Sequence, residues 1–451
     1  MVSKYHNFKK KMYLFFKSKF TFSNYFNLLL ALIPLSFIAG NLVINANIIL
    51  LIISTLFLFG MDSLKIKYSF VDKLILLFFF LILFTGIIND YYLYYNEGSW
   101  RGYFSTTLKS IFFFKYLFLF VILRYLIEKN IIDLKFFFIT STLASLFVCF
   151  DIFFQLQYGK DIFGFEGMGA QRKLGGPFGD ELIAGGFIQR FSIFSFFLFP
   201  IFYKRVPKKI IALSIPFLFV IFLLGIIFSG NRMPLILFLF IVCLIVIFQK
   251  QTRKFFLPFV IVLPLIFLLL VNTSPIVKIN FEHFYKRVSN MTIILINKDI
   301  ENKNVPQHLK EFESFYNTWL MNKYIGGGIK NFRYYCHHRP NIPKDSKFIC
   351  NMHPHNYYLE VLTETGLVGF VVISIIFSLI LLNTFYKKYF TKSHLQNNIL
   401  IIPFIFLFIA EIFPIKSTGS FFTTGNTTYL FLIISILIGL SYKNNSIENK
   451  N

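Results

Sequence analysis

Residues 208–250 read KKIIALSIPFLFVIFLLGIIFSGNRMPLILFLFIVCLIVIFQK, and this stretch indicates the fold class most clearly. Two apolar runs, at about 209–228 and 232–249, lie on either side of the short polar segment Ser229–Arg232. Each run has roughly the 17 to 25 residues that a helix needs to cross the hydrocarbon core of a bilayer. Backbone amides in lipid must be satisfied within the chain, so the stretch predicts two spanning helices joined by a short connection.

The rest of the chain repeats this pattern. Of its 451 residues, 56% are hydrophobic, 20% aromatic and 15% charged, which excludes a soluble globular protein. The sequence predicts an all-α integral membrane protein with about twelve transmembrane helices and a large outward-facing loop between the ninth and tenth. The expected helices are about 25–44, 46–61, 73–88, 105–126, 132–156, 186–203, 209–228, 232–249, 255–272, 357–383, 397–413 and 427–441.

The formal net charge of +24 comes from Lys and Arg in short clusters between the apolar runs. Clusters such as Lys9–Lys11 and Lys387–Lys388 fall in every second connection, which is the positive-inside pattern of membrane proteins. This placement argues against nucleic acid as a partner and orients the chain in its membrane. An even number of spans leaves both termini cytoplasmic, and the basic start, which lacks a cleavage site, is expected to be retained.

These features divide the chain into five expected regions. They are a basic cytoplasmic tail at 1–24, spans at 25–272, an outward loop at 273–356, further spans at 357–441 and a cytoplasmic tail at 442–451. Two shorter outward segments also stand out. Residues 89–104 carry Trp100 and several tyrosines, typical of an interfacial belt or a sugar-stacking surface. Residues 157–185 are Gly-rich, contain Arg172 and suit a re-entrant or capping loop over a substrate cavity.

Two sites in this apolar background carry chemistry. Arg232 lies near the outer membrane face, where a guanidinium is costly to desolvate unless an anion or a dipole meets it. The alternative is an arginine that extends to the lipid headgroups. The segment HPHNYYLEVLTETGLVGF, residues 353–370, lies where the large loop re-enters the membrane. A histidine there suits a general base, although His353 or His355 could instead cap the helix or bond a backbone carbonyl.

These elements resemble a known family. His355-Asn356, followed after nine residues by Gly366-Leu367-Val368-Gly369, is similar to the His-Asn…Gly-x-x-Gly signature of bacterial O-antigen ligases and polymerases. The segment SGNR is similar to that family's Ser-x-x-Arg element. The resemblance covers about residues 180–380 in detail and extends to the topology of the whole chain.

The resemblance implies a metal-independent glycosyltransferase of the bacterial inner membrane that needs no cofactor. It implies a glycan donor carried on undecaprenyl pyrophosphate, an acceptor such as lipid A-core or another glycan, and a periplasmic active site. His355 would deprotonate the acceptor hydroxyl and Arg232 would hold the donor pyrophosphate, as a guanidinium fork can. Asn356, Glu364 and Arg172 are further candidates for substrate binding.

The resemblance also implies a second arginine in the large loop, ahead of an aromatic residue and a Gly-rich turn. Trp319 and Gly326–Gly328 fit that pattern, but His308 stands where the arginine is expected. Arg287, Arg333 and His308 are the candidates for the second phosphate ligand. Arg287 is preferred because it lies in the membrane-proximal part of the loop, although each of the three could be an ordinary solvated charge.

The four cysteines fall into two pairs. Cys149 and Cys243 lie inside expected spans and are interpreted as packing residues. Cys336 and Cys350 share the outward loop, where an oxidising compartment favours a disulfide. The competing interpretation is zinc, since histidines stand close to both cysteines in the sequence, but their spacing fits no standard structural zinc site.

The favoured function is therefore an inverting, O-antigen ligase-like glycosyltransferase. An O-antigen polymerase or a protein O-oligosaccharyltransferase of the same family would use the same elements with another acceptor. A transporter or flippase of lipid-linked glycans is the alternative from a different class. Charged residues within the spans are sparse and no internal repeat is evident, which favours catalysis over transport.

Overall fold

The computed structural model describes residues 22–97, 105–167, 173–203, 206–297, 307–339, 350, 354–417 and 419–448. Side chains at some positions within helices, including Arg287 and His308, are outside this description. Within the described ranges the chain is mainly helical, and an isolated β bridge joins Lys160 to Glu166. The all-α prediction is confirmed for this part of the chain, as expected for apolar segments that must satisfy their own backbone.

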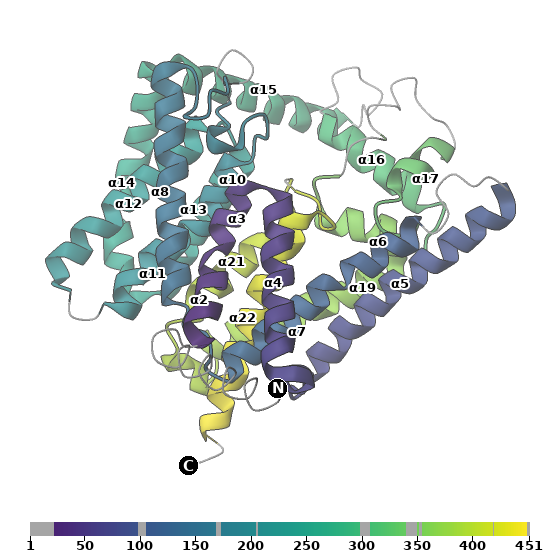
Figure 1. The fold of residues 1–451 in the computed structure, drawn as a ribbon. Helices are drawn as coiled ribbons and strands as arrows, with labels where there is room; N and C mark the ends of the chain where they lie inside the picture. Colours follow the sequence, from purple (N-terminus) through teal and green to yellow (C-terminus); the bar gives the residue numbers. More distant parts are fainter. Residues whose placement is uncertain are drawn as a thin grey trace.

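The first half of the chain forms helices at the apolar runs (Figure 1). Pro34 lies in the first turn of one of them, where its missing amide interrupts the hydrogen bonding of the span. The helices are α2 (Phe22–Ala31), α3 (Ile33–Ala39), α4 (Asn41–Phe59), the 3-10 helix η1 (Gly60–Leu64), α5 (Phe70–Glu97), α6 (Ser105–Phe113), α7 (Lys115–Glu128) and α8 (Lys135–Tyr158).

The second half continues the pattern with shorter and broken elements. They are η2 (Gly176–Phe178), α10 (Ala184–Phe191), α11 (Ile193–Phe202), α12 (Lys208–Phe228), α13 (Arg232–Phe248), α14 (Lys250–Thr273), α15 (Pro275–Asn297), α16 (Gln307–Trp319) and α17 (Phe332–His338). They are followed by α19 (Tyr357–Leu381), the π-helix η3 (Leu382–Tyr386), α20 (Lys387–Tyr389), η4 (His394–Asn397), α21 (Ile402–Glu411) and α22 (Thr424–Glu448).

The number of spans is lower than the sequence predicts. Within the described residues, nine helices are long and apolar enough to cross a membrane, or ten if the bent pair in α14 counts as one span. That pair bends by 41° between Pro258 and Val262. The apolar helices α13 and α21 have only 17 and 10 residues. Ten residues of helix extend about 15 Å, half of a hydrocarbon core of about 30 Å. The chain is a multi-pass membrane protein, and its count of twelve spans stays a prediction.

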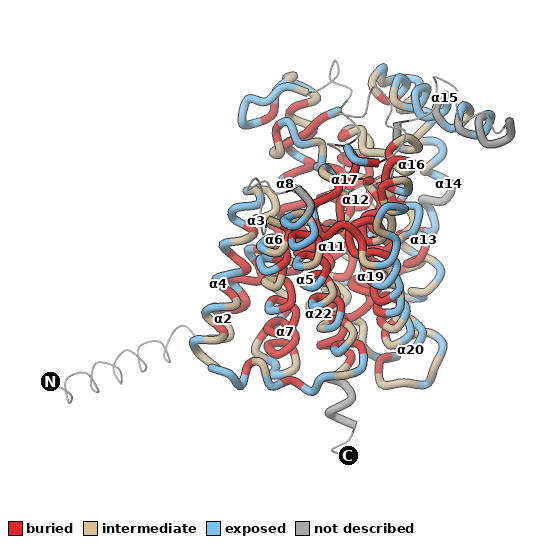
Figure 2. The backbone as a smooth tube through the Cα atoms, turned by 90° about the vertical axis from the view of Figure 1, so that its right-hand side faces the viewer, coloured by how far each residue is buried: buried red, intermediate tan, exposed pale blue. Residues whose placement is uncertain are grey.

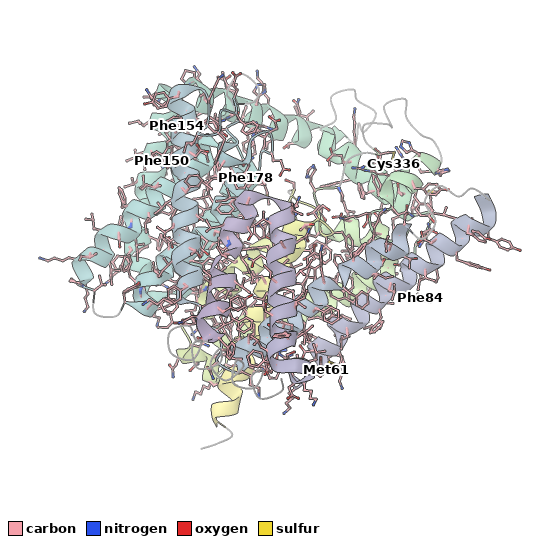
Figure 3. All side chains as sticks on the ribbon, in the orientation of Figure 1. Met61, Phe84, Phe150, Phe154, Phe178 and Cys336 are labelled. Carbon is pink, nitrogen blue, oxygen red and sulfur yellow. A yellow bond between two sulfur atoms is a disulfide. The ribbon has the colours of Figure 1, made fainter. Side chains whose placement is uncertain are left out.

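Apolar side chains cover the outside of the bundle as well as its core. Phe84 on α5 and Phe150 on α8 are 54% and 59% exposed and point away from the bundle (Figure 3). Such surfaces are unfavourable in water and suit contact with lipid. Buried residues are concentrated on α7 and α22, whereas α15 is largely exposed (Figure 2).

The stretch expected as an outward loop, 273–356, contains α15, α16 and α17. These helices lie at one end of the bundle, here called the site end, whereas the last turns of α22 lie at the opposite end (Figure 1). Cys336 on α17 forms a disulfide with Cys350. The buried rings of Phe315 and Phe332 stack beside it with their centroids 3.5 Å apart. Which side of the membrane this end faces stays a prediction.

Helix α19 is broken at Gly366, and the Gly-rich turn between α16 and α17 fills the break. Gly366 has φ 68° and ψ −171°, a conformation that interrupts the helical hydrogen bonds and favours glycine. A Cβ atom there would overlap the carbonyl oxygen of Tyr324. Four backbone hydrogen bonds join the two segments, from Gly327 to Thr363, Gly328 to Glu364, Leu367 to Lys323 and Val368 to Tyr324.

Two buried side chains form hydrogen bonds with the backbone of this Gly-rich turn. Asn89 of α5 donates its amide to the Gly326 carbonyl at 3.0 Å and accepts the Tyr335 hydroxyl at 2.6 Å. Asn331 donates to the Gly327 carbonyl at 2.8 Å. Backbone groups that a broken helix frees must be satisfied at membrane depth, and here protein groups satisfy them. The first turns of α19 are thus fixed to α5 and to the segment before α17.

We predict that Gly366→Ala destabilises the protein by about 2 kcal/mol or more, because the new Cβ meets backbone in a conformation that alanine resists. Gly186→Ala in α10 is the control, since its Cβ would meet only Pro234 Cγ at 3.9 Å. Thermal unfolding in detergent measures both variants. Equal midpoints for the two variants would contradict the proposed clamp between the turn and α19.

Candidate functional site

The turn before Arg232 is fixed to the start of α10. Asn231 accepts the Gly185 amide on Oδ1 at 2.9 Å and donates Nδ2 to the Leu182 carbonyl at 3.1 Å. A Cβ on Gly185 would lie 2.5 Å from Ser229 Oγ, so only glycine allows this approach. The polar residues of SGNR therefore serve mainly to anchor Arg232, which begins α13.

Arg232 lies at the rim of an apolar cavity. Its Nη2 donates to the Asn280 carbonyl of α15 at 3.3 Å, and its guanidinium lies 5.7 Å from the Phe284 ring centroid. The cavity has a volume of about 190 Å³ and is partly open to the outside. Arg232 is the one charged residue among the described residues that line it, and the apolar lining includes Ile226, Leu235, Ile236, Phe267 and Phe281. One cation beside an apolar cavity suits an amphiphile with an anionic head.

His355 directly precedes α19 and has a left-handed backbone. Its φ is 52°, which is uncommon for a residue other than glycine, and its side chain is half-buried. The next residue, Asn356, caps the helix, since its Oδ1 accepts the Tyr358 and Leu359 amides at 3.0 and 3.1 Å. Its Nδ2 donates to the Pro414 carbonyl at 2.8 Å. The prediction of substrate binding by Asn356 stays untested, and the contacts described are those of a helix cap.

A buried ionic cluster lies beside this helix start. Glu411 at the end of α21 accepts from Arg190 of α10 through Nη2 at 2.7 Å and Nε at 3.2 Å. The same carboxylate accepts from Lys416 at 2.6 Å and from the Tyr357 hydroxyl at 2.5 Å. We call Arg190, Tyr357, Glu411 and Lys416 the Glu411 cluster. Burial lowers the pKa of Lys416 to about 8.

This cluster is not among the site residues predicted from the sequence. Arg190 and Glu411 lie within apolar runs, and an ionisable residue in such a run is by itself a signal of function. Their pairing across 221 positions has no signature in local spacing.

The first turns of α19 also bury two carboxylates. Glu360 accepts from Ser420 Oγ and from the Phe421 amide, both at 2.5 Å. Glu364, predicted to bind substrate, accepts the Lys330 amide at 2.8 Å and is 3% exposed. These bonds tie α19 to the segment before α22 and to the Gly-rich turn. The contact described for Glu364 is with the protein's own backbone.

The other predicted residues lie on α15, α16 or α17, or outside the described part. Arg333 is exposed on α17. Arg287 and His308 lie in α15 and α16, but their side chains are outside the described part, as are Arg172 and His353 altogether. Among the described residues, no group of three or more His, Cys, Asp or Glu side chains could hold a metal ion.

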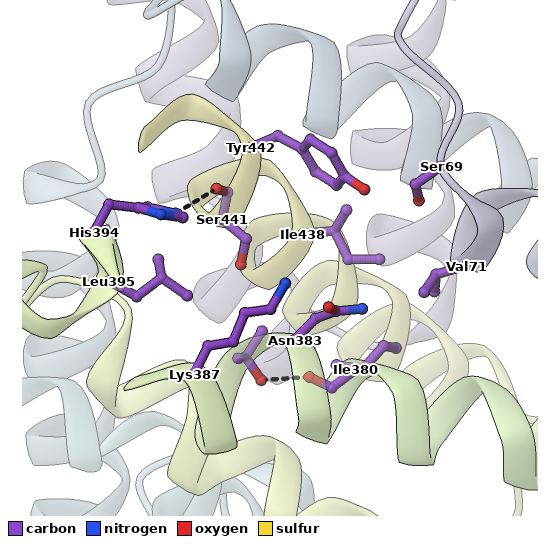
Figure 4. Close-up of a pocket in the computed structure, with 11 residues that line it drawn as sticks. Ser69, Val71, Ile380, Asn383, Lys387, His394, Leu395, Ile438, Ser441 and Tyr442 are labelled. Atoms are coloured by element: carbon purple, nitrogen blue, oxygen red, sulfur yellow. Dashed lines mark hydrogen bonds between the residues drawn. The ribbon is translucent and has the colours of Figure 1, made fainter. Parts of the chain in front are cut away.

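A second pocket lies at the opposite end of the bundle (Figure 4). It is lined by residues from the start of α5, the end of α19, η3, α20, η4 and α22, among them Asn383, Lys387 and Tyr442. His394 also lines it, with Nε2 at 3.2 Å from the Ser441 carbonyl. None of the site residues predicted from the sequence lines this pocket. The candidate site is therefore the one at the site end.

The comparison with known families covers the segment from α12 to α19, which contains Arg232 and His355. Residues 217–374 match the family model described as O-Antigen ligase, and no curated protein matches the chain. The matched segment contains Arg232, His355, Asn356 and the break in α19. This segment is therefore similar to the O-antigen ligase and polymerase family, in agreement with the resemblance carried by the His-Asn and Ser-x-x-Arg elements.

Proposed function

We propose that this protein transfers a glycan from undecaprenyl pyrophosphate to an acceptor hydroxyl at the periplasmic face of the bacterial inner membrane, as an O-antigen ligase does. The observation that carries the proposal is Arg232 at the rim of an apolar cavity within the matched segment. A polyprenyl pyrophosphate is an amphiphile of that kind, with an apolar chain and an anionic head.

The cavity offers separate contacts for the apolar chain and for the anionic head of the donor. Apolar residues of α12 to α15 contact the polyprenyl chain, and Arg232 binds a phosphate oxygen, since a guanidinium forms strong, charge-assisted hydrogen bonds in a dry site. Position 287 follows Asn280 by seven residues and therefore lies on the same face of α15. We assign the second phosphate contact to Arg287 on that ground.

The reaction step follows from the two predicted roles. His355 takes the proton of the acceptor hydroxyl as its oxygen attacks the anomeric carbon of the donor sugar. The bond from that carbon to the phosphate oxygen breaks, and its electron pair leaves with undecaprenyl pyrophosphate. Arg232 stabilises the charge that grows on the leaving group. Attack opposite the leaving group inverts the anomeric configuration, and the histidine later releases its proton to water.

The acceptor decides between the ligase and its relatives. An O-antigen polymerase or a protein O-oligosaccharyltransferase would use the same base and the same arginine with a glycan or a protein hydroxyl. The ligase is preferred because the matched family model is described as O-Antigen ligase. A flippase would move the same donor without breaking its sugar–phosphate bond.

We predict that His355→Ala lowers glycan transfer by about 10²- to 10⁴-fold, the usual contribution of a general base. The variant is expressed in a deletion strain, and a gel separates bare lipid A-core from the capped ladder while lipid-linked glycan is quantified. His394→Ala is the control, because His394 lies in the pocket at the opposite end.

The ligase proposal expects bare core and accumulated long lipid-linked polymer in the deletion strain and with His355→Ala. Core that carries a single repeat unit would instead identify a polymerase. Normal capping with His355→Ala would contradict the assignment of the base.

We predict that Arg232→Lys lowers kcat/KM for the lipid-linked donor about tenfold or more, since an ammonium cannot replace a bidentate guanidinium. The assay measures transfer by purified protein in nanodiscs at varied donor concentration. Arg253→Lys is the control, because Arg253 bonds the Val246 and Ile247 carbonyls of the protein itself. Equal donor kinetics for the wild type and Arg232→Lys would contradict the assigned phosphate contact.

A further inference from the structure

The Glu411 cluster is an unusual arrangement for the interior of a membrane protein. Its side chains are almost fully buried, with Arg190 15%, Glu411 1% and Lys416 4% exposed. Arg190 and Lys416 both pair with the same carboxylate, so the protonated cluster carries one excess positive charge. Aromatic faces share that charge, since Arg190 lies 4.9 Å from the Tyr429 centroid and Lys416 4.3 Å from the Tyr357 centroid.

Stability alone gives no reason for this cluster. Burying an ion pair often contributes less than well-packed apolar residues of the same volume would, because desolvation offsets the attraction. Four segments of the chain nevertheless converge on Glu411, namely α10, the start of α19, the end of α21 and the segment after it. A buried charge network of this kind fixes one arrangement of its elements, which a merely apolar contact does not.

The elements that converge here carry the proposed catalytic groups. Tyr357, two residues after His355, bonds Glu411, and Asn356 bonds the carbonyls of Pro414 and Lys416. On the other side, α10 begins at the residues that hold the turn before Arg232, through the Gly185 amide and Asn231 Oδ1. The cluster thus lies between the start of α19 and the turn that anchors Arg232.

We propose that the Glu411 cluster is a positioning centre that holds His355 in register with Arg232 for glycosyl transfer. This inference rests on the proposed function. Arg190, Glu411 and Lys416 act through Tyr357 and Asn356, so they are positioning residues with no contact to the reacting atoms. Their loss is expected to lower kcat and to leave binding of the donor, which depends on Arg232 and the apolar cavity, largely unchanged.

The first test compares Tyr357→Phe, Glu411→Gln and the double variant in the nanodisc assay. We expect kcat to fall about tenfold or more with Glu411→Gln, while KM for the lipid-linked donor changes by less than about threefold. Because Tyr357 and Glu411 act through the hydrogen bond that they share, the double variant should be no slower than Glu411→Gln alone. Independent, multiplying losses, or a loss confined to KM, would overturn the proposal.

The chain offers a matched control for generic loss of stability. Asp72 and Arg124 form a buried ion pair at the opposite end, and Arg124 lies 4.6 Å from the Tyr442 ring centroid. Asp72→Asn therefore removes the same chemistry away from the site. It should lower the thermal stability, as Glu411→Gln does, and keep kcat at the wild-type value. Equal effects of Asp72→Asn and Glu411→Gln on kcat would reduce the cluster to a structural role.

The second test uses the proton of Lys416. The charged groups that face this ammonium are Glu411 and Arg190, with the Tyr357 ring beside it. Burial lowers the pKa of Lys416 to about 8, so the wild type loses this charge as the pH rises through that value. The ratio of wild-type to Lys416→Met kcat should be large at pH 7 and approach one near pH 9.5. A ratio that does not change with pH would overturn the role of Lys416.

The proposed function and the proposed role of the Glu411 cluster can be contradicted by different results. If His355→Ala keeps full transfer, the proposed base is wrong, whatever the cluster does. If His355→Ala abolishes transfer and Glu411→Gln keeps the kcat of the wild type, the proposed function stands and the positioning role of the cluster is wrong.

Discussion

The break in α19 is the constraint on which the site depends. A helix that ends at Gly366 and resumes at Leu367 frees amides and carbonyls that lipid cannot satisfy. The turn at 323–328 supplies the missing partners, and Asn89 holds that turn to α5. The short outer part of α19 is thereby clamped on one side by this turn and on the other by Glu411 and Ser420. His355 stands at the end of this clamped piece.

The proposed transfer depends on two residues, Arg232 and His355, and hydrogen bonds fix the backbone beside each of them. Arg232 follows a turn that is bonded to the start of α10, and it borders an apolar cavity. His355 precedes a helix cap that is bonded to the segment after α21. Three buried carboxylates at this end, Glu411, Glu360 and Glu364, accept hydrogen bonds from groups of the protein itself. A preorganised site of this kind would keep its geometry without water, which would strengthen the proposed contact with the donor pyrophosphate.

Apolar run lengths located every membrane helix, because hydrophobicity over about 20 residues is a strong local signal. The predicted count of twelve spans is not confirmed, since α13 and α21 are shorter than the candidate spans of the described part. The motif at 353–370 pointed to His355 and to the glycines. The structure shows that Asn356 caps α19 and that Gly366 has the backbone conformation of the break. Arg190 and Glu411 escaped notice because their pairing is a tertiary fact, set by packing between helices that are far apart in sequence.

The most direct test of the account is the fate of the carrier. Purified protein in nanodiscs is given undecaprenyl-pyrophosphate-linked glycan and lipid A-core, and free undecaprenyl pyrophosphate and glycosylated core are quantified together. If the protein is the proposed transferase, free undecaprenyl pyrophosphate and glycosylated core appear in equal amounts, because each new glycosidic bond releases one carrier. A donor that stays intact, in the presence of every acceptor of the family, while the protein moves it across liposome membranes would contradict the account and identify a transporter.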